Sequence, residues 1–215
     1  MNRPIRSYVL RQGRTTPAQA RALEELYPRY GLRFTGEPLE KPFGREAPLV
    51  LEIGSGMGET TAAIAKARPD ADFIAAEVHG PGVGSLLNRL ASEGLENVRV
   101  IRHDAVEVLS RMVADDALAA IHLFFPDPWP KKRHHKRRLV QPEFAALAAR
   151  KLVSGGLLHA ATDWPDYAEH MEKVFSLEPL LQTAGQGFVQ RPPTKFEARG
   201  RKLGHPIRDL FFRRR

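Results

Sequence analysis

The sequence predicts an α/β fold in which helices cover both faces of a mostly parallel, doubly wound sheet. Strand-like and helix-like segments alternate from residue 49 onward, and this alternation is typical of right-handed crossovers between parallel strands. A glycine-rich turn follows the first strand-like segment, and an acidic residue stands at or near the end of each of the first three. Since ligands bind at the carboxyl edge of such sheets, we expect a binding site there.

The individual elements follow from apolar runs and from their stop signals. The expected strands cover residues 48–53, 72–77, 98–101, 119–125 and 157–161. The expected helices cover residues 60–68, 105–113, 142–152 and 165–175. One more helix is expected after the second strand and reaches about residue 92. Residues 79–84 are glycine-rich, so the second crossover helix is expected to begin late. Gly155 and Gly156 are expected to stop the helix before them, and the last part of the chain to hold irregular segments and closing strands.

Length and composition predict one such domain with a short extension. The chain has 215 residues, and we expect a basic N-terminal extension over residues 1–45, with one helical stretch near residues 18–26, and the main domain over residues 46–215. No apolar run approaches the roughly 18 residues that span a bilayer. Residues 1–6 lack the apolar stretch of a signal peptide, and the chain has no cysteine. A cytoplasmic protein without a membrane partner is therefore expected.

Positive charge is concentrated in three segments. The net charge is +8, and residues 1–23, 131–138 and 191–215 together carry a surplus of eighteen positive charges, so the rest of the chain has a net charge of −10. A basic surface on an acidic body favours a polyanionic partner such as nucleic acid. Basic tails that only improve solubility are the alternative.

The glycine turn is the sharpest local motif. The segment from Leu51 to Gly58 reads LEIGSGMG, with Gly54, Gly56 and Gly58 at alternate positions. Such glycines let the backbone approach a ligand, and the helix N-terminus offers free N–H donors. A dinucleotide-binding loop has wider glycine spacing, so this turn, with Glu52 just before it, suits a ligand without a pyrophosphate. S-adenosylmethionine is such a ligand, because its amino end needs an acid and its carboxyl end needs backbone donors.

Two further acids end the next two expected strands. Glu77 stands where a carboxylate can accept both ribose hydroxyls of an adenosyl group. Asp104 follows the third strand, where it can accept the exocyclic amine of adenine. Acids at these positions also commonly cap the following helix, so capping is the alternative for each of them.

A proline-framed segment follows the fourth expected strand. Pro126, Pro128 and Pro130 make a stiff turn around Asp127 and Trp129 at the carboxyl edge of the sheet. An acid held there beside an aromatic ring is suited to orient a planar base. The alternative is that the prolines only end the strand and that Trp129 belongs to the core.

A basic run and a further acid complete the candidate site. Residues 131–138 read KKRHHKRR, which favours phosphate contacts, with a localisation signal as the alternative. His134 and His135 are adjacent and no further ligand is in register with them, so no metal site is expected. Asp163 stands two residues before Pro165, where it is either a ligand contact or a helix N-cap.

Taken together, these motifs resemble those of the bacterial tRNA (guanine-N7-)-methyltransferases over nearly the whole chain. The matching segments are Arg3 to Tyr8, Glu52 to Gly58, Pro126 to Arg138, Ala161 to Trp164, Thr194 to Glu197, and Arg199 to His205. The proline-framed basic segment and the TKFE sequence of residues 194–197 are specific to this family. The glycine turn is shared by methyltransferases in general.

The resemblance implies a fold, a cofactor and a methyl acceptor. The fold is the Rossmann-like, seven-stranded class I methyltransferase fold, the cofactor is S-adenosylmethionine, and the acceptor is N7 of guanine 46 in the variable loop of tRNA. The resemblance assigns the cofactor-site acids to Glu52, Glu77, Asp104 and Asp127, the last of which is also catalytic. It assigns substrate binding to Lys131, Asp163, Thr194, Lys195, Phe196 and Glu197. It assigns RNA contacts to Arg133, His134, His135, Lys136, Arg137 and Arg138.

Two other functions stay open on the residues alone. One is a methyltransferase that acts on rRNA or protein, and the other is a non-catalytic RNA-binding protein on an inactive methyltransferase scaffold. The intact acids argue against the second. The glycine spacing and the lack of a hydride-handling site disfavour a nicotinamide-dependent dehydrogenase. Whether the chain is a monomer or a homodimer is not determined.

Overall fold

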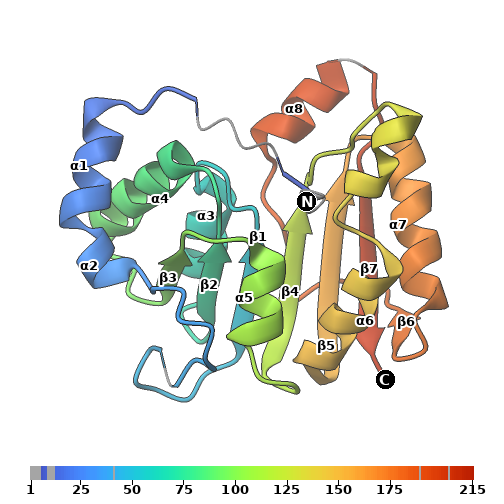
Figure 1. Ribbon diagram of the computed structural model, residues 1–215, viewed down its shortest axis with the longest axis horizontal. Helices are drawn as coiled ribbons and strands as arrows, with labels where there is room; N and C mark the ends of the chain where they lie inside the picture. Colours follow the sequence, from blue (N-terminus) through green and yellow to red (C-terminus); the bar gives the residue numbers. More distant parts are fainter. Residues whose placement is uncertain (1–5, 9–12, 41, 189, 203) are drawn as a thin grey trace, which may run out of the picture.

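The computed structural model contains a single seven-stranded sheet with helices on both faces (Figure 1). It describes residues 6–8, 13–40, 42–188, 190–202 and 204–215. The strand order is β3-β2-β1-β4-β5-β7-β6. The strands are β1 (Leu49–Ile53), β2 (Asp72–Ala76), β3 (Val98–Ile101), β4 (Leu118–Phe124), β5 (Leu152–Thr162), β6 (Leu181–Thr183) and β7 (Arg208–Arg214).

All neighbouring strands from β3 to β5 are parallel, and β7 is antiparallel to both of its neighbours. The predicted doubly wound, mostly parallel seven-stranded sheet is therefore confirmed. The strand order reverses between β1 and β4. In folds of this type, the carboxyl ends of the strands on either side of that reversal form the ligand-binding crevice.

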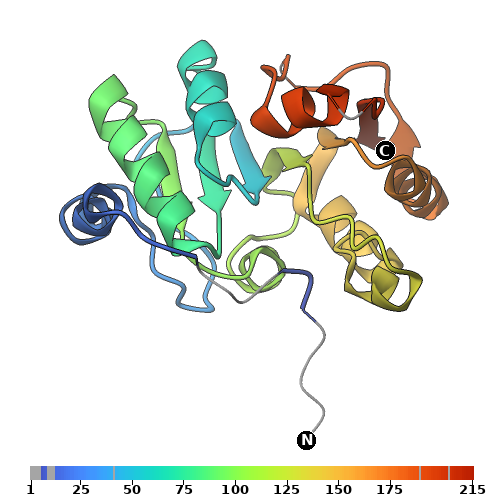
Figure 2. The ribbon, with the colours of Figure 1, turned by 90° about the horizontal axis from the view of Figure 1, so that it is seen from above.

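The helices form two layers, one on each face of the sheet (Figure 2). One layer consists of α3 (Glu59–Ala67) and α4 (Gly80–Glu93), and the other of α5 (Ala105–Arg111), α6 (Pro142–Lys151) and α7 (Pro165–Leu177). α1 (Pro17–Glu25) packs on the outside of α4 and leads into α2 (Tyr27–Tyr30). The 3₁₀ helix η1 (Lys132–Arg137) follows β4, and α8 (Lys195–Lys202) lies beyond the carboxyl ends of β4 and β5 (Figure 1).

Each face of the sheet has its own hydrophobic core, because side chains alternate along a strand. On β1, Leu51 and Ile53 face the core under α5, α6 and α7, whereas Val50 faces the core under α3 and α4. The central strands are buried on both faces, which accounts for their near-continuous apolar sequence.

The expectation that the second crossover helix begins late is wrong, because α4 begins at Gly80. Its glycines are sites of close packing. A Cβ atom on Gly82 would lie 2.4 Å from the carbonyl oxygen of Gly56, and one on Gly84 would lie 2.5 Å from that of Gln19. The imidazole of His79 caps the helix by accepting a hydrogen bond from Gly82 N at 3.2 Å. Glycine therefore serves helix packing here and does not delay the helix.

The expected stop at Gly155 and Gly156 is also misplaced. α6 ends at Lys151 and β5 begins at the next residue, so both glycines lie inside the strand. Gly155 has a φ of 77°, and the pairing of β5 with β4 changes register between Leu118 and Ala120. The glycine permits this irregularity in the strand, which therefore begins earlier than the apolar run at residue 157 predicts.

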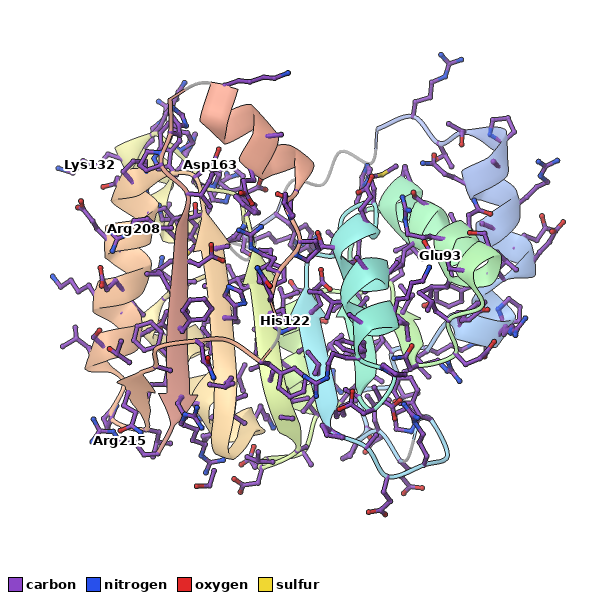
Figure 3. The ribbon with its side chains drawn as sticks, turned by 180° about the vertical axis from the view of Figure 1, so that it is seen from behind. Glu93, His122, Lys132, Asp163, Arg208 and Arg215 are labelled. Carbon is purple, nitrogen blue, oxygen red and sulfur yellow. The ribbon has the colours of Figure 1, made fainter. Side chains whose placement is uncertain are left out.

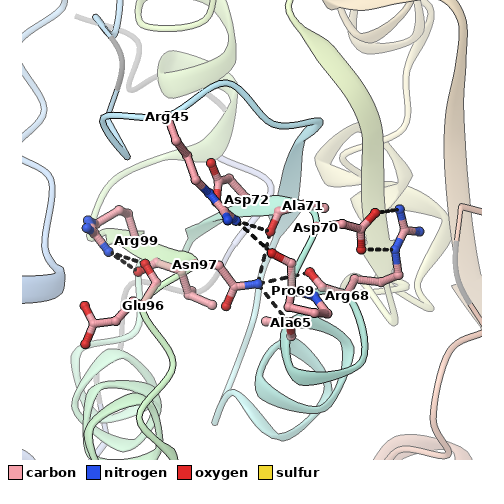
Figure 4. Close-up of polar contacts among 11 residues, drawn as sticks. Arg45, Ala65, Arg68, Pro69, Asp70, Ala71, Asp72, Glu96, Asn97 and Arg99 are labelled. Atoms are coloured by element: carbon pink, nitrogen blue, oxygen red, sulfur yellow. Dashed lines mark hydrogen bonds and ion pairs between the residues drawn. The ribbon is translucent and has the colours of Figure 1, made fainter.

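At the amino edge of the sheet, a set of polar contacts ties the loops around β2 together (Figure 4). Arg45 donates to the buried carboxylate of Asp72 and to the carbonyl oxygens of Pro69 and Ala71. The Asn97 side-chain amide donates to Ala65 O, Arg68 O and Ala71 O at 3.0–3.1 Å. These contacts satisfy backbone carbonyls in the last turn of α3 and in the loop that follows it. They leave the opposite, carboxyl edge for the functional site.

Candidate active site

The glycine turn between β1 and α3 has a backbone that only glycine adopts readily. Gly54, Gly56 and Gly58 have φ values of 76°, 56° and 80°, all in the left-handed region. A Cβ atom on Gly58 would lie 2.6 Å from the side chain of Leu86, whereas no atom lies within 4 Å of a Cβ built on Gly54 or Gly56. Gly58 is therefore needed for packing, and Gly54 and Gly56 border open space that a ligand can enter.

Two cavities meet at this turn. The first, of about 220 Å³, is lined by Gly54, Gly56, Glu77, Asp104 and Asp127 among others. The second, of about 420 Å³, is lined by Glu52, by residues 54–57 and by Thr194 among others. Both cavities share the glycine turn and the rings of Phe124 and Phe125. The structure thus brings the four acids singled out from the sequence to the walls of two adjoining cavities.

Glu52 is a buried acid beside the second cavity. Glu52 is 2% exposed, and its Oε2 atom has no hydrogen-bond partner among the described residues. Burial raises the pKa of Glu52 to about 7, the nearby Glu77 carboxylate adds to the increase, and the Thr61 hydroxyl opposes it. A buried carboxylate oxygen without a partner is costly. A cationic or N–H-bearing ligand in the cavity would supply the missing contact.

Glu77 and Asp104 both bind backbone N–H groups while facing the first cavity. The Glu77 carboxylate accepts from Gly56 N at 2.7 Å and from His79 N at 2.8 Å, so it joins the glycine turn to the start of α4. Asp104 caps α5 by accepting from Val106 N at 2.8 Å. The capping alternative therefore holds for Asp104. Each carboxylate oxygen can accept a second hydrogen bond, so these contacts still leave acceptor capacity toward the cavity.

Asp127 lies at the mouth of the first cavity on a constrained turn. Phe125 and Trp129, two residues away on either side, have φ values of 51° and 45°, which is uncommon for non-glycine residues and often found at functional sites. Although the residue is exposed, enough protein surrounds its carboxyl group for partial burial to raise the pKa of Asp127. Trp129 belongs to neither core, and its indole N–H donates to Ser7 O at 3.1 Å.

The basic run forms η1, directly after this turn. Lys131, Lys132, Arg133, Lys136 and Arg137 are exposed, and His134 and His135 are half-buried. Lys136 and Arg137 also line a third cavity of about 660 Å³, which shares Asp104 with the first. The exposed cations therefore stand beside the acid-lined cavity.

Arg138 differs from the rest of the predicted RNA-contacting run. Its side chain is 1% exposed and forms an ion pair with Asp166 at the start of α7. Its Nε atom also donates to Pro128 O at 2.9 Å. Arg138 therefore links the proline-framed turn to α7, and its buried side chain does not share the exposure of the lysines and arginines before it. A contact between Arg138 and RNA stays a prediction.

The predicted substrate-binding residues other than Lys131, which is the N-cap of η1, lie at or near α8. Thr194 caps α8 by accepting from Glu197 N at 3.0 Å, and the buried Glu197 carboxylate pairs with Arg191 at 2.8 Å. Asp163 does not cap α7, whose N-cap is Trp164. It lies next to α8 (Figure 3), with its Oδ2 atom 3.9 Å from Nδ1 of His205. The side chains of Lys195 and Phe196, and the residues Arg3 to Ile5 that also carried the resemblance, lie outside the described parts of the structure.

Comparison with known proteins names the family. A family model described as a putative methyltransferase matches residues 46–210. A tRNA (guanine-N(7)-)-methyltransferase of Aromatoleum aromaticum is 56% identical, over 100% of this chain and 85% of that protein. The chain belongs to the tRNA (guanine-N(7)-)-methyltransferase family. A family member from Nitrosomonas eutropha is likewise 56% identical, over 97% of this chain and 96% of its own length.

Solved structures confirm the fold of this methyltransferase family member. The 16S rRNA methyltransferase KamB is 15% identical, with a TM-score of 0.57, and the alignment covers 95% of this chain and 96% of KamB. At that identity the similarity extends to the fold alone. The described residues of our methyltransferase contain no helix that is long and apolar enough to span a bilayer, and no group of three His, Asp or Glu residues placed to hold a metal ion.

Sequence reasoning gave no role to three features of this site. The rings of Phe124 and Phe125 line both cavities, and Tyr8 lines the first. Arg191 packs over both phenylalanine rings, 5.7 and 5.2 Å from their centroids. Tyr8 stands within a segment that carried the family resemblance. For Arg191 the only local signal is its place before Pro192 and Pro193, which says nothing of its distant partners.

Proposed function

We propose that this chain transfers the methyl group of S-adenosylmethionine to N7 of guanine 46 in tRNA. The observation that supports it most directly is the acid-lined cavity at the glycine turn, whose lining includes the exposed Asp127. This cavity shares Asp104 with the cavity that Lys136 and Arg137 of η1 line. The membership of the chain in the tRNA (guanine-N(7)-)-methyltransferase family supports the reaction class. The boundary between an extension at residues 1–45 and a methyltransferase domain at residues 46–215 is part of this proposal.

The residues at the cavities fit S-adenosylmethionine. The partnerless, buried Glu52 oxygen suits the amino group of the methionine end, and the open space at Gly54 and Gly56 suits a close approach of the ligand to the backbone. Glu77 and Asp104 lie on the first cavity with acceptor capacity for ribose hydroxyls and the adenine amine. When bound, the cofactor would supply an electrophilic methyl group on a positively charged sulfur.

The acceptor requires little proton chemistry from the protein. N7 of guanine presents a lone pair and carries no proton, so no general base is needed to create the nucleophile. The protein then contributes mainly by positioning and by electrostatics. Methylation leaves a positive charge on the guanine, and the Asp127 carboxylate at the cavity mouth would stabilise that charge and hold the ring. The exposed residues of the 131–137 segment would bind phosphates of the tRNA.

The deciding experiment is incubation with labelled S-adenosylmethionine and unmodified tRNA, followed by nucleoside analysis and mapping of the modified position. Label in N7-methylguanosine at position 46 is the expected result. Label in parallel incubations with rRNA or with protein, and none with tRNA, would identify a different acceptor. Cofactor binding measured by calorimetry tests the remaining alternative. A non-catalytic RNA-binding protein on an inactive scaffold would bind RNA without binding the cofactor.

A further inference from the structure

One part of the sheet is covered by an extended segment in place of a helix. Opposite α6 and α7, the face formed by β4, β5 and β7 is crossed by the chain that runs from β6 to α8, which passes near His122 (Figure 3). The crossing is close. A Cβ atom on Gly187 would lie 3.0 Å from Nδ1 of His159 and 2.9 Å from the ring of Phe211. This face also carries Asp209, which pairs with Ala161 in the β5–β7 register.

Arg191, near the end of this crossing, joins three other parts of the molecule. Its Nη1 donates to Oε2 of Glu197 on α8 at 2.8 Å, and its Nε and Nη2 donate to the two carboxylate oxygens of Asp209 on β7, each at 3.1 Å. The guanidinium also lies over the rings of Phe124 and Phe125. The side chains of Arg191 and Glu197 are 6% and 8% exposed, so their ion pair is largely shielded from water, whereas the Asp209 side chain is 30% exposed.

Asp209, which accepts hydrogen bonds from Arg191, is itself held by a second residue of the sheet. His159 on β5 contacts Oδ1 of Asp209 at 2.7 Å through its Nε2. Burial acts to raise the pKa of Asp209, but the hydrogen bonds from His159 and Arg191 prevail and lower it to about 2. Beside them, burial and the nearby His159 lower the pKa of His122 to about 3, so His122 is neutral. Asp209 therefore stays ionised and presents both oxygens to Arg191 at neutral pH.

We propose that Arg191 is a positioning residue for the methyl acceptor: it holds the first turn of α8 against the aromatic wall of the two cavities. The inference rests on the proposed function. Glu197, which Arg191 holds, belongs to the segment assigned to substrate binding, and Thr194, which caps the same turn, lines the second cavity. The phenylalanines under the guanidinium line both cavities. Arg191 thus sets the position of the acceptor segment relative to the cofactor cavity.

Arginine is required here because of its shape. Its planar guanidinium binds the two Asp209 oxygens side by side while a further N–H reaches Glu197, and its face lies over the aromatic rings. A lysine keeps the charge but offers a single ammonium group that cannot reproduce this set of contacts. The two substitutions Arg191→Lys and Arg191→Met therefore separate the charge from the geometry.

The test measures the kinetics with tRNA and the binding of the cofactor separately. For Arg191→Met we expect the KM for tRNA to rise at least tenfold and kcat to fall, while the dissociation constant for S-adenosylmethionine, measured by calorimetry, changes less than about twofold. For Arg191→Lys, the KM for tRNA and kcat should lie between those of the wild type and those of Arg191→Met. Glu197→Gln should also raise the KM for tRNA, and combining it with Arg191→Met should add little, because both changes remove the ion pair between Arg191 and Glu197.

Arg208→Met is the matched control. Arg208 is the next residue to Asp209 on β7, but it is more exposed and pairs with Glu172 on α7. Its loss removes one positive charge from the same strand and should leave all three constants near the wild-type values.

Three results would overturn the inference. If the wild-type protein methylates tRNA and both Arg191 variants have the same kcat and KM for tRNA as the wild type, the inference is refuted. A parallel loss of cofactor and tRNA binding, which indicates a purely structural role, would also refute it. If Arg191→Met does not fold, a fully active Arg191→Lys gives the same refutation. A wild-type chain that does not methylate tRNA would instead refute the proposed function and this inference with it.

Discussion

Asp127 combines a constrained backbone, a raised pKa and a place at the mouth of the acid-lined cavity. We expect Asp127→Asn, which keeps the shape and removes the charge, to lower kcat about 100-fold, a typical loss for one electrostatic group in a transition state. The affinity for S-adenosylmethionine should change less than about fivefold, because three other acids remain. Single-turnover kinetics and calorimetry measure the two effects. Near-normal turnover would rule out a catalytic role for Asp127.

Glu52 gives the second prediction at the scale of a single residue. Its pKa is raised from 4.5 to about 7 by burial, so near pH 6 it is mostly protonated without ligand and near pH 8 mostly ionised. A ligand that binds the ionised form lowers this pKa, and its affinity therefore rises with pH. We expect the affinity for S-adenosylmethionine to increase about tenfold from pH 6 to pH 8, the change in the ionised fraction.

The control for this pH dependence is Glu52→Gln, which cannot titrate. Measured in the same buffers, the variant should lose the tenfold increase and keep only the pH dependence of the ligand and of the other groups. The same pH dependence in both proteins would show that Glu52 does not meet the cofactor in its ionised form.

At the scale of the elements, the contact between α4 and the glycine turn depends on Gly82. A Cβ atom there would lie 2.4 Å from Gly56 O, a backbone atom that cannot move without shifting the turn. Gly82→Ala improves intrinsic helix propensity, yet we expect it to lower the free energy of unfolding by about 1–3 kcal/mol, as overpacking does, and to weaken cofactor binding. Denaturant unfolding and calorimetry provide the measurements.

Gly185→Ala is a suitable control for that change. Gly185 has no positive φ, and a Cβ atom on this residue would have no other atom within 4 Å. The substitution should therefore leave both stability and cofactor affinity nearly unchanged. If Gly82→Ala behaves like Gly185→Ala, the close approach of α4 to the glycine turn does not matter for the site.

At the scale of the whole molecule, the segregation of charge places exposed cations beside an acid-lined cavity. We expect replacement of Lys132, Arg133, Lys136 and Arg137 by glutamine to reduce the slope of log K for tRNA against log salt by up to about 3, since each lost phosphate contact contributes about 0.7–0.9. The methyl-transfer step on saturating tRNA should change little. Binding isotherms at several salt concentrations give the slope.

Two variants show whether this effect belongs to η1. Arg29 and Lys66 are exposed cations on α2 and α3, away from the carboxyl edge, and their replacement by glutamine should leave the slope unchanged. Arg138→Met should act through stability, because Arg138 is buried against Asp166. An unchanged slope in the fourfold variant would contradict the phosphate role of η1.

Much of the fold was predictable because its signals are local. Each parallel strand is a short apolar run, and the first five predicted strands appear in the structure, although β5 begins earlier than expected. Glycine, in contrast, was read wrongly twice. Gly82 serves close packing, because a Cβ atom there would meet Gly56 O, a contact with a distant segment. Gly155 has a positive φ where β5 changes register against β4, a pairing that is also set by a distant strand.

The sheet, the glycine turn, the acids at the strand ends and the basic run follow from local sequence, because they depend on periodicity, backbone freedom and charge along the chain. Which side chains of the site face inward depends on the packing of the whole fold. In the folded chain Arg138 is buried and Asp104 caps α5. Arg191 pairs with Glu197 and Asp209 and lies over the rings of Phe124 and Phe125. The physical reason is that burial and pairing are set by neighbours far apart in sequence, such as residues 124, 191 and 209, which no local pattern records.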